Sequence, residues 1–130
     1  MKKPKITMTV IKEDDGFSAH TTAGKNFIAT EGNDIDELKN NIIEAVNLSF
    51  KDKGFTYVID EIELKPDLAS FFEFYKVINA KALSERIGMN QSLLAQYING
   101  TKKPSPTQTQ RILNGVQKVG RELASIQFFL

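Results

Sequence analysis

The sequence lacks cysteine and any long hydrophobic run, and it has a single histidine, His20. Without cysteine the chain has no disulfide framework and no thiolate metal site. A membrane helix needs roughly 18 to 20 consecutive apolar residues, which no part of the chain provides, and its first residues lack the apolar core of a signal peptide. We therefore expect a cytoplasmic protein without a membrane partner, a metal or a cofactor.

The nearly neutral net charge of +1 conceals an asymmetry between the two halves of the chain. Residues 1–66 hold 9 Lys/Arg against 12 Asp/Glu, a balance of −3, whereas residues 67–130 hold 8 against 4, a balance of +4. Opposite signs favour two different partners, one of them a polyanion.

Alternating apolar and polar residues dominate the start of the chain. The alternation predicts three strands, over residues 5–12, 17–21 and 26–31. Phe27 and Ala29 share one face of the third strand. Glycine-containing turns at 13–16 and 23–25 would join the strands into an antiparallel meander.

The period changes to that of a helix after Gly32. Asp34 can cap this helix, with Glu37 three residues later as in a capping box. Its apolar positions are Ile35, Leu38, Ile42, Ile43, Val46 and Phe50. Alternation returns over Tyr57–Leu64, with Val58, Ile62 and Leu64 on one face, and predicts a fourth strand that Pro66 closes. The first half is thus expected to form a small, wholly antiparallel β-β-β-α-β domain, with the helix covering one face of the sheet.

The carboxylates of this half would form a nuclease site only if they converged on a metal. Asp14 and Asp15 lie in an expected turn, Asp34 at a helix start and Asp60 in an expected strand, where capping and solvated roles account for them. A solvent-facing strand position accounts for His20. We therefore do not expect an enzyme. An RNase-H-like nuclease with a DNA-targeting module is kept as an alternative.

The second half begins with an aromatic-rich helix. Pro66 and Asp67 favour a helix start, and large apolar residues follow at helical spacing. These residues are Leu68, Phe71, Phe72 and Tyr75. We expect them to fill the core of the second domain, with a seam against the first domain or another subunit as the alternative.

Residues 80–99 carry the pattern of a helix-turn-helix. Leu83 and Ile87 give a first short helix an apolar face, and Gly88 can adopt the left-handed conformation that ends it. Asn90 can cap a second helix, whose buried side would carry Leu94, Tyr97 and Ile98. In DNA-binding proteins the second helix of such a pair enters the major groove.

The exposed side of that second helix supplies the candidate site. Gln91, Ser92 and Gln96 are expected to contact base edges, because Gln pairs with adenine and Ser with several bases. Asn90, Lys102 and Lys103 are expected to approach phosphates, which contributes affinity without reading sequence. A solvated loop is the alternative for the two lysines.

A helical pattern with an apolar seam runs from Pro106 to the end. The seam comprises Ile112, Val116, Val119, Leu123 and Ile126. Gly115 and Gly120 weaken a continuous helix, so we expect a break near Gly120. The predicted oligomer contacts are Leu123, Ile126, Phe128 and Phe129. These residues would pack on a twin subunit or, alternatively, on their own domain.

Two segments carry a family resemblance. Gly32-Asn33-Asp34-Ile35-Asp36-Glu37-Leu38 resembles the turn-into-helix segment "GDTLEEA" of HicB antitoxins. Tyr97–Ser105 resembles the "NGxxxPS" loop of Xre/Cro-like helix-turn-helix proteins, and many HicB proteins join the two domains in this order. The family's Pro/Gly/Cys-rich segment between the second and third strands is reduced here to Thr22-Ala23-Gly24-Lys25.

The resemblance implies an α+β fold in which a partial RNase-H-like domain, residues 1–66, precedes an all-α helix-turn-helix domain, residues 67–130. It implies a type II antitoxin that blocks a HicA-like mRNA-cleaving toxin and, as a homodimer or larger homo-oligomer, represses its own operon by binding double-stranded operator DNA. The alternative is a stand-alone helix-turn-helix regulator whose first domain senses a ligand or dimerises.

Overall fold

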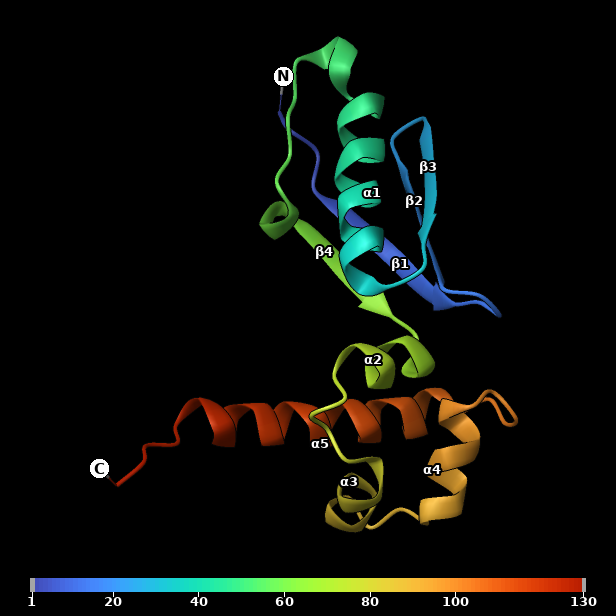
Figure 1. Ribbon diagram of the computed structural model, residues 1–130, viewed down its shortest axis with the longest axis vertical. Coiled ribbons are helices and arrows are strands. Elements are labelled where there is room, and N and C mark those ends of the chain that lie inside the picture. The colour runs from blue at the N-terminus through green and yellow to red at the C-terminus, as the bar shows by residue number, and fades with distance from the viewer. Residues whose placement is uncertain (1, 130) are drawn as a thin grey trace. The chain divides into compact units, whose positions relative to one another are not determined.

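The computed structural model describes residues 2–129 and divides between Phe74 and Tyr75 into two compact units (Figure 1). The sequence placed the boundary earlier, between residues 66 and 67. The division at Phe74 sharpens the charge asymmetry, because residues 1–74 hold 9 Lys/Arg against 14 Asp/Glu (−5) and residues 75–130 hold 8 against 2 (+6).

A four-stranded sheet forms the first unit. Its strands are β1 (Ile6–Lys12), β2 (Phe17–Ala23), β3 (Asn26–Gly32) and β4 (Ile62–Pro66), in the order β3-β2-β1-β4. β1, β2 and β3 form the predicted antiparallel meander, with Val10 opposite Ala19 and Thr21 opposite Ile28. The mixed α and β content agrees with the expected α+β class.

The wholly antiparallel sheet predicted for this unit is wrong. β4 pairs parallel with β1, with Ile6 opposite Ile62 and Val10 opposite Pro66, so the sheet is mixed. Parallel neighbours need a crossover connection, and α1 (Ile35–Ser49) lies within the connection between β3 and β4. The alternation of side chains along β4 is the same for either pairing, so the sequence pattern could not distinguish them.

The predicted start of the fourth strand is also wrong. The strand begins at Ile62, after a short 3₁₀ turn over Ile59–Glu61, and the side chain of Val58 is exposed. Glu61 closes this turn, because its amide donates to the Val58 carbonyl and its side chain accepts from the Val58 amide, both at 3.0 Å. The segment before Ile62 therefore makes local hydrogen bonds, whereas the alternating pattern predicted that it would pair with a neighbouring strand.

One face of the sheet is covered by α1 and the other is open. Asp34 caps α1 as predicted, and its Oδ1 accepts from the Glu37 amide at 2.8 Å. The core between α1 and the sheet contains Ile6, Met8, Val10, Phe17, Ala19, Ile28, Leu38, Ile42, Val46, Phe50, Tyr57 and Ile62. Phe27 and Ala29 share the open face of β3 and are exposed.

Helix α2 (Leu68–Phe74) continues directly from β4. Its cap residue Asp67 accepts from the Ser70 amide at 2.8 Å and from the Lys12 amide at 3.1 Å. The ring of Phe74 lies 4.6 Å from the ring of Phe17, centroid to centroid. Phe74 therefore packs on the sheet, and α2 belongs to the first unit rather than to the second domain, whose core its large apolar residues were expected to fill.

Three helices form the second unit: α3 (Ala80–Arg86), α4 (Gln91–Ile98) and α5 (Pro106–Ala124). The break expected near Gly120 is wrong, because α5 runs unbroken to Ala124. A glycine inside a helix costs only about 1 kcal/mol relative to alanine, which a helix packed over several turns tolerates. Within residues 2–129 no helix is both long and apolar enough to cross a membrane.

The segment before β4 carries a pH-sensitive contact. Lys3 Nζ donates to the Thr56 carbonyl at 2.6 Å and to Glu61 Oε2 at 2.7 Å. The hydrogen bond from Lys3, and then that from the Val58 amide, lower the pKa of Glu61 below its usual value.

Replacing Glu61 with Gln should therefore reduce stability in a pH-dependent way. A carboxyl group with a lowered folded-state pKa stabilises the fold above its unfolded pKa of about 4.3, and the effect is lost as the pH falls through the folded value. We expect E61Q to be less stable than the wild type near pH 7 and equal to it at a strongly acidic pH, below the folded-state pKa of Glu61. Hydrogen exchange of the β1 and β4 amides would measure this unit alone. An equal gap at both pH values would contradict the assignment.

Candidate nucleic-acid interface

A tight turn joins α3 to α4 at residues 87–90. Gly88 has φ +66°, in the left-handed region that favours glycine, and its amide donates to the Glu85 carbonyl. Met89, in the middle of the turn, is buried and its amide donates to the Ser84 carbonyl at 2.9 Å. The predicted role of Gly88 in ending the first helix is thus confirmed.

Asparagine caps begin both helices of the pair. Asn79 Oδ1 accepts from the Ala82 amide at 3.0 Å at the start of α3. Asn90 Oδ1 accepts from the amides of Ser92 and Leu93 at 2.8 and 3.2 Å at the start of α4. The side chain of Asn90 is therefore occupied as a cap, as the sequence predicted.

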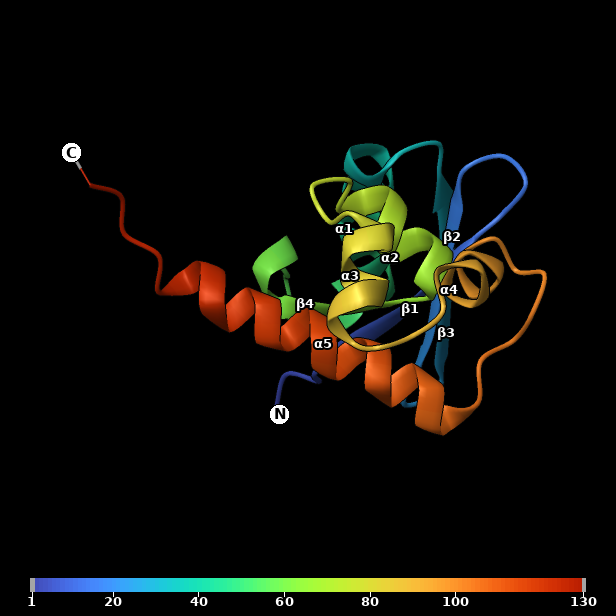
Figure 2. The same ribbon diagram turned by 90° about the horizontal axis from the view of Figure 1, so that it is seen from below.

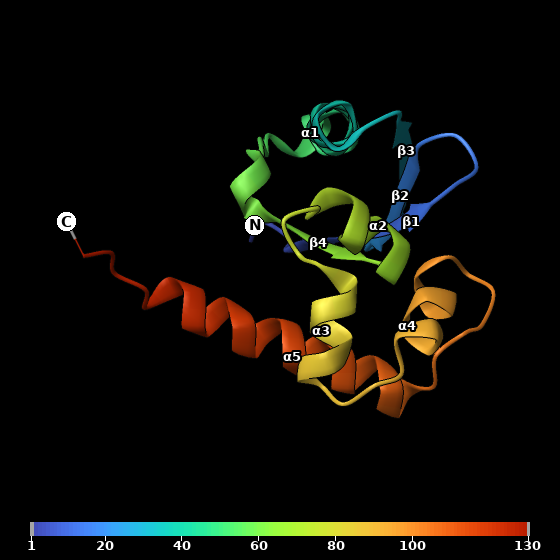
Figure 3. The same cartoon turned by 60° about the horizontal axis from the view of Figure 1, so that its bottom comes forward.

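The three helices of the second unit lie beside one another (Figure 3), and they enclose a small core. Its buried residues are Leu83, Ser84, Met89, Leu94 and Ile112. The hydroxyl of Ser84 donates to the Lys81 carbonyl at 2.6 Å, so this small polar residue is buried with its hydrogen bond made. An ion pair between Arg86 and Glu122 also joins α3 to α5.

One stripe of α4 faces solvent. Its exposed residues are Gln91, Ser92, Ala95 and Asn99, the last of which follows the helix directly. At about 100° per residue these positions fall within roughly one quarter of the helix circumference. Gln91 and Ser92, two of the predicted base contacts, lie in this stripe, whereas Gln96 is half-buried at its margin. Ala95 lies near the middle of the stripe and was not selected from the sequence.

The loop after α4 presents two cations. Lys102 and Lys103 are exposed, and the Lys102 amide donates to the Gln96 carbonyl at 3.2 Å. Asn99 Oδ1 accepts from the Thr101 amide at 2.9 Å. These two hydrogen bonds hold the loop against the end of α4, so Lys102 and Lys103 lie directly after the exposed stripe.

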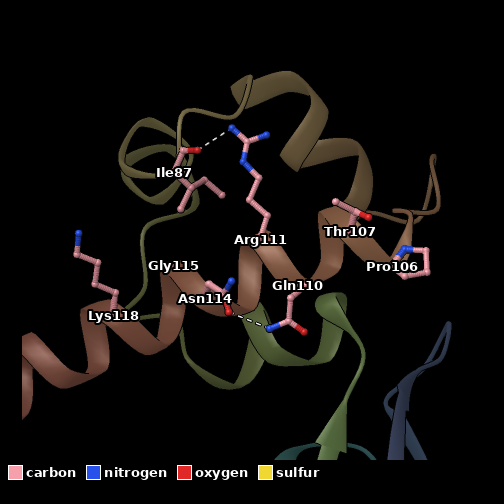
Figure 4. Close-up of a pocket in the computed structure, with 8 residues that line it drawn as sticks. All are labelled: Ile87, Pro106, Thr107, Gln110, Arg111, Asn114, Gly115 and Lys118. Atoms are coloured by element: carbon pink, nitrogen blue, oxygen red, sulfur yellow. Dashed lines mark hydrogen bonds between the residues drawn. The ribbon is translucent and has the colours of Figure 1, made fainter.

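Arg111 on α5 holds the turn between the two helices, a role that the sequence did not reveal. Its Nη2 donates to the Ile87 carbonyl at 2.7 Å (Figure 4) and to the Gly88 carbonyl at the same distance. These carbonyls follow the C-terminus of α3, where helix carbonyls lack intrahelical partners and a cation is favourable. Arg111 also lines an open groove of about 780 Å³ between the turn and α5, together with Gln110, Asn114 and Lys118.

Gly115 allows α5 to pass close to α3. A Cβ added at this position would overlap Cγ2 of Ile87, whereas one added at Gly120 would meet nothing within 4 Å. The first glycine is therefore required by packing, and the second is not.

The end of the chain leaves a row of apolar side chains exposed. The ion pair with Arg86 ties α5 to α3 as far as Glu122, and residues 123–129 continue beyond it as an arm of the second unit (Figure 2). Leu123, Ile126, Phe128 and Phe129 are between 57% and 103% exposed. Their own unit does not cover them, although packing on their own domain was the alternative that the sequence left open.

The acidic residues of the first unit remain dispersed. Within residues 2–129 no three His, Cys, Asp or Glu side chains are placed to hold a metal ion together. Asp34 and Asp67 are helix caps. His20 lies on the open face of the sheet, stacked on Phe27 with ring centroids 6.4 Å apart.

Comparison of the chain with protein-family models, with curated proteins and with solved structures found no match.

The two glycines of α5 offer a matched pair of substitutions. Gly120→Ala should stabilise the second unit by up to about 1 kcal/mol, because alanine is the better helix former. Gly115→Ala should destabilise it by about 1 to 3 kcal/mol despite the same gain in propensity, because the added methyl group would overpack the contact with Ile87. Urea denaturation measured by helical circular dichroism would compare the two. Equal changes would mean that α5 does not pack against α3 through Gly115.

Proposed function

We propose that the second unit binds operator DNA through α4, which would enter the major groove. The observation that carries this proposal is the solvent-facing stripe of Gln91, Ser92 and Ala95, followed directly by Lys102 and Lys103. The stripe offers amide and hydroxyl groups for base edges and a methyl group for thymine, and the lysines offer charge for the backbone. It belongs to a unit with a balance of +6, as a polyanion-binding module requires.

The exposed apolar arm supports binding as a dimer. Pairing of two copies through Leu123, Ile126, Phe128 and Phe129 would cover side chains that are otherwise in water. A two-fold dimer would present two α4 helices to half-sites about one DNA turn apart.

We propose further that the acidic first unit binds a basic protein, and that the chain is a HicB-like antitoxin. The balance of −5 over residues 1–74 has the sign needed for such a partner, a HicA-like RNase. The turn-into-helix segment at residues 32–38 and the loop at residues 97–105 resemble that family. On this proposal the chain is a binding protein rather than an enzyme: it blocks the toxin with one unit and represses its operon with the other.

Substitutions in α4 and in the loop should affect DNA binding in different ways. Gln91→Ala should cost roughly 1 to 3 kcal/mol on the operator and nothing on random DNA, because it removes a base contact. Lys102→Ala should weaken binding to the operator and to random DNA alike. It should also reduce the slope of the logarithm of the binding constant against the logarithm of the salt concentration by about one unit. Fluorescence anisotropy would compare an operator selected by the wild type from a random library with random DNA. The matched control is Gln117→Ala, an exposed glutamine of α5. Losses for Gln91→Ala that are equal on both DNAs would reject the base-reading role.

Co-expression with a small basic RNase encoded beside this chain tests the antitoxin role. We expect a complex on size exclusion, loss of RNA cleavage, and the same result with Gln91→Ala and Lys102→Ala, since the proposed toxin surface belongs to the other unit. Absence of a complex with cleavage unaffected would leave a stand-alone DNA-binding regulator.

A further inference from the structure

The two edges of the sheet are protected to different degrees. β4 has five residues, carries Glu63 and Lys65, and ends at Pro66. Short length, charge and proline are the features that keep sheet edges from pairing with other chains. β3 has seven residues and neither lysine nor proline.

The register of the hairpin fixes which backbone groups of β3 point outward. Gly24 and Lys25 form a two-residue turn, so Ala23 and Asn26 are the closing hydrogen-bonded pair. Bonded and non-bonded pairs then alternate, which directs the amides and carbonyls of Phe27, Ala29 and Glu31 away from β2. An independent contact agrees with this assignment, because the outward Glu31 carbonyl accepts from Asn41 Nδ2 of α1 at 2.7 Å.

Exposed apolar side chains flank this edge. Phe27 is 68% exposed on the open face of β3. On the covered face, Leu48 of α1 is 73% exposed. Leu48 follows Asn41 by two helical turns, so both residues lie on the same side of α1. Asn41 is the residue whose side chain contacts the β3 edge. A partner strand along β3 would bring new contacts to Phe27 and Leu48.

We propose that β3 pairs antiparallel with β3 of a second copy of this chain. An axis at Ala29 would place the two Ala29 residues opposite each other and Phe27 opposite Glu31 of the other copy. Each outward amide would then face a carbonyl, the smallest side chain of the three would lie at the axis, and like charges would not face each other. This interface is separate from the one proposed for the α5 arm, so a chain using both would form assemblies larger than a dimer.

Light scattering after size exclusion tests both interfaces in the full-length chain. Ala29→Pro removes an outward amide but no bond to β2, so the β2–β3 ladder should persist. Phe128→Ser with Phe129→Ser disables the arm. We expect the wild type to have a mass greater than that of a dimer. Ala29→Pro alone and the arm variant alone should each have the mass of a dimer, and the two combined should have the mass of a monomer. Ala29→Ser, which keeps the amide, should match the wild type.

The outcomes separate this inference from the dimer of the proposed function. A monomer from the arm variant alone, or no change of mass with Ala29→Pro in that variant, would overturn the β3 interface. A monomer from Ala29→Pro alone would support the β3 interface and reject the arm.

Cysteine cross-linking tests the register without proline. The natural chain has no cysteine, so each variant has a single thiol. Facing residues of a hydrogen-bonded pair lie about 5.5 Å apart at Cα, within reach of a disulfide. In the arm variant, Ala29→Cys should form a covalent dimer on mild oxidation, whereas Glu63→Cys on the other edge should not. Equal yields from the two would overturn the proposal.

Discussion

A parallel neighbour for β1 requires the chain to return to the same end of the sheet, and α1 lies within the connection that returns it. The pairing continues past β4, because the Asp67 amide donates to the Val10 carbonyl at 2.9 Å. Asp67 also caps α2, so the ladder determines where α2 begins and how Phe74 reaches the ring of Phe17. The core beneath α1 and the position of α2 both depend on this pairing.

Locally determined features of the fold could be predicted from the sequence. The β1–β2 and β2–β3 hairpins and the cap of α1 depend on residues a few positions apart, and their patterns identified them. The start of β4 depends on the local turn over Ile59–Glu61 together with distant groups, and its direction depends on the pairing with β1. Lys3 contacts Glu61 across 58 positions, and Tyr57 donates its hydroxyl to the Pro4 carbonyl across 53. A pattern of alternating side chains holds no information on such contacts.

In the candidate interface, too, local features could be predicted from the sequence and contacts between distant residues could not. The caps of Asn79 and Asn90 and the turn at Gly88 are local and were predicted. Arg111 holds that turn from more than twenty positions away, and the role of Gly115 depends on Ile87, so neither could be recognised without the packing of α5 on α3. The break expected near Gly120 was wrong for a related reason: helix propensity alone does not show that the packing of α5 outweighs the cost of about 1 kcal/mol for a glycine.

The charge of the two units bears on how they work together. If the second unit binds DNA as proposed, a unit with a balance of −5 would be repelled by the same DNA, so its covalent connection to a unit of +6 would lower the affinity of the chain for random DNA. Base contacts from α4 would then have to supply a larger share of the proposed operator binding. A basic partner on the first unit would neutralise that repulsion, and its arrival would strengthen DNA binding through electrostatics alone. Because linkage is reciprocal, DNA would in turn favour the partner-bound form.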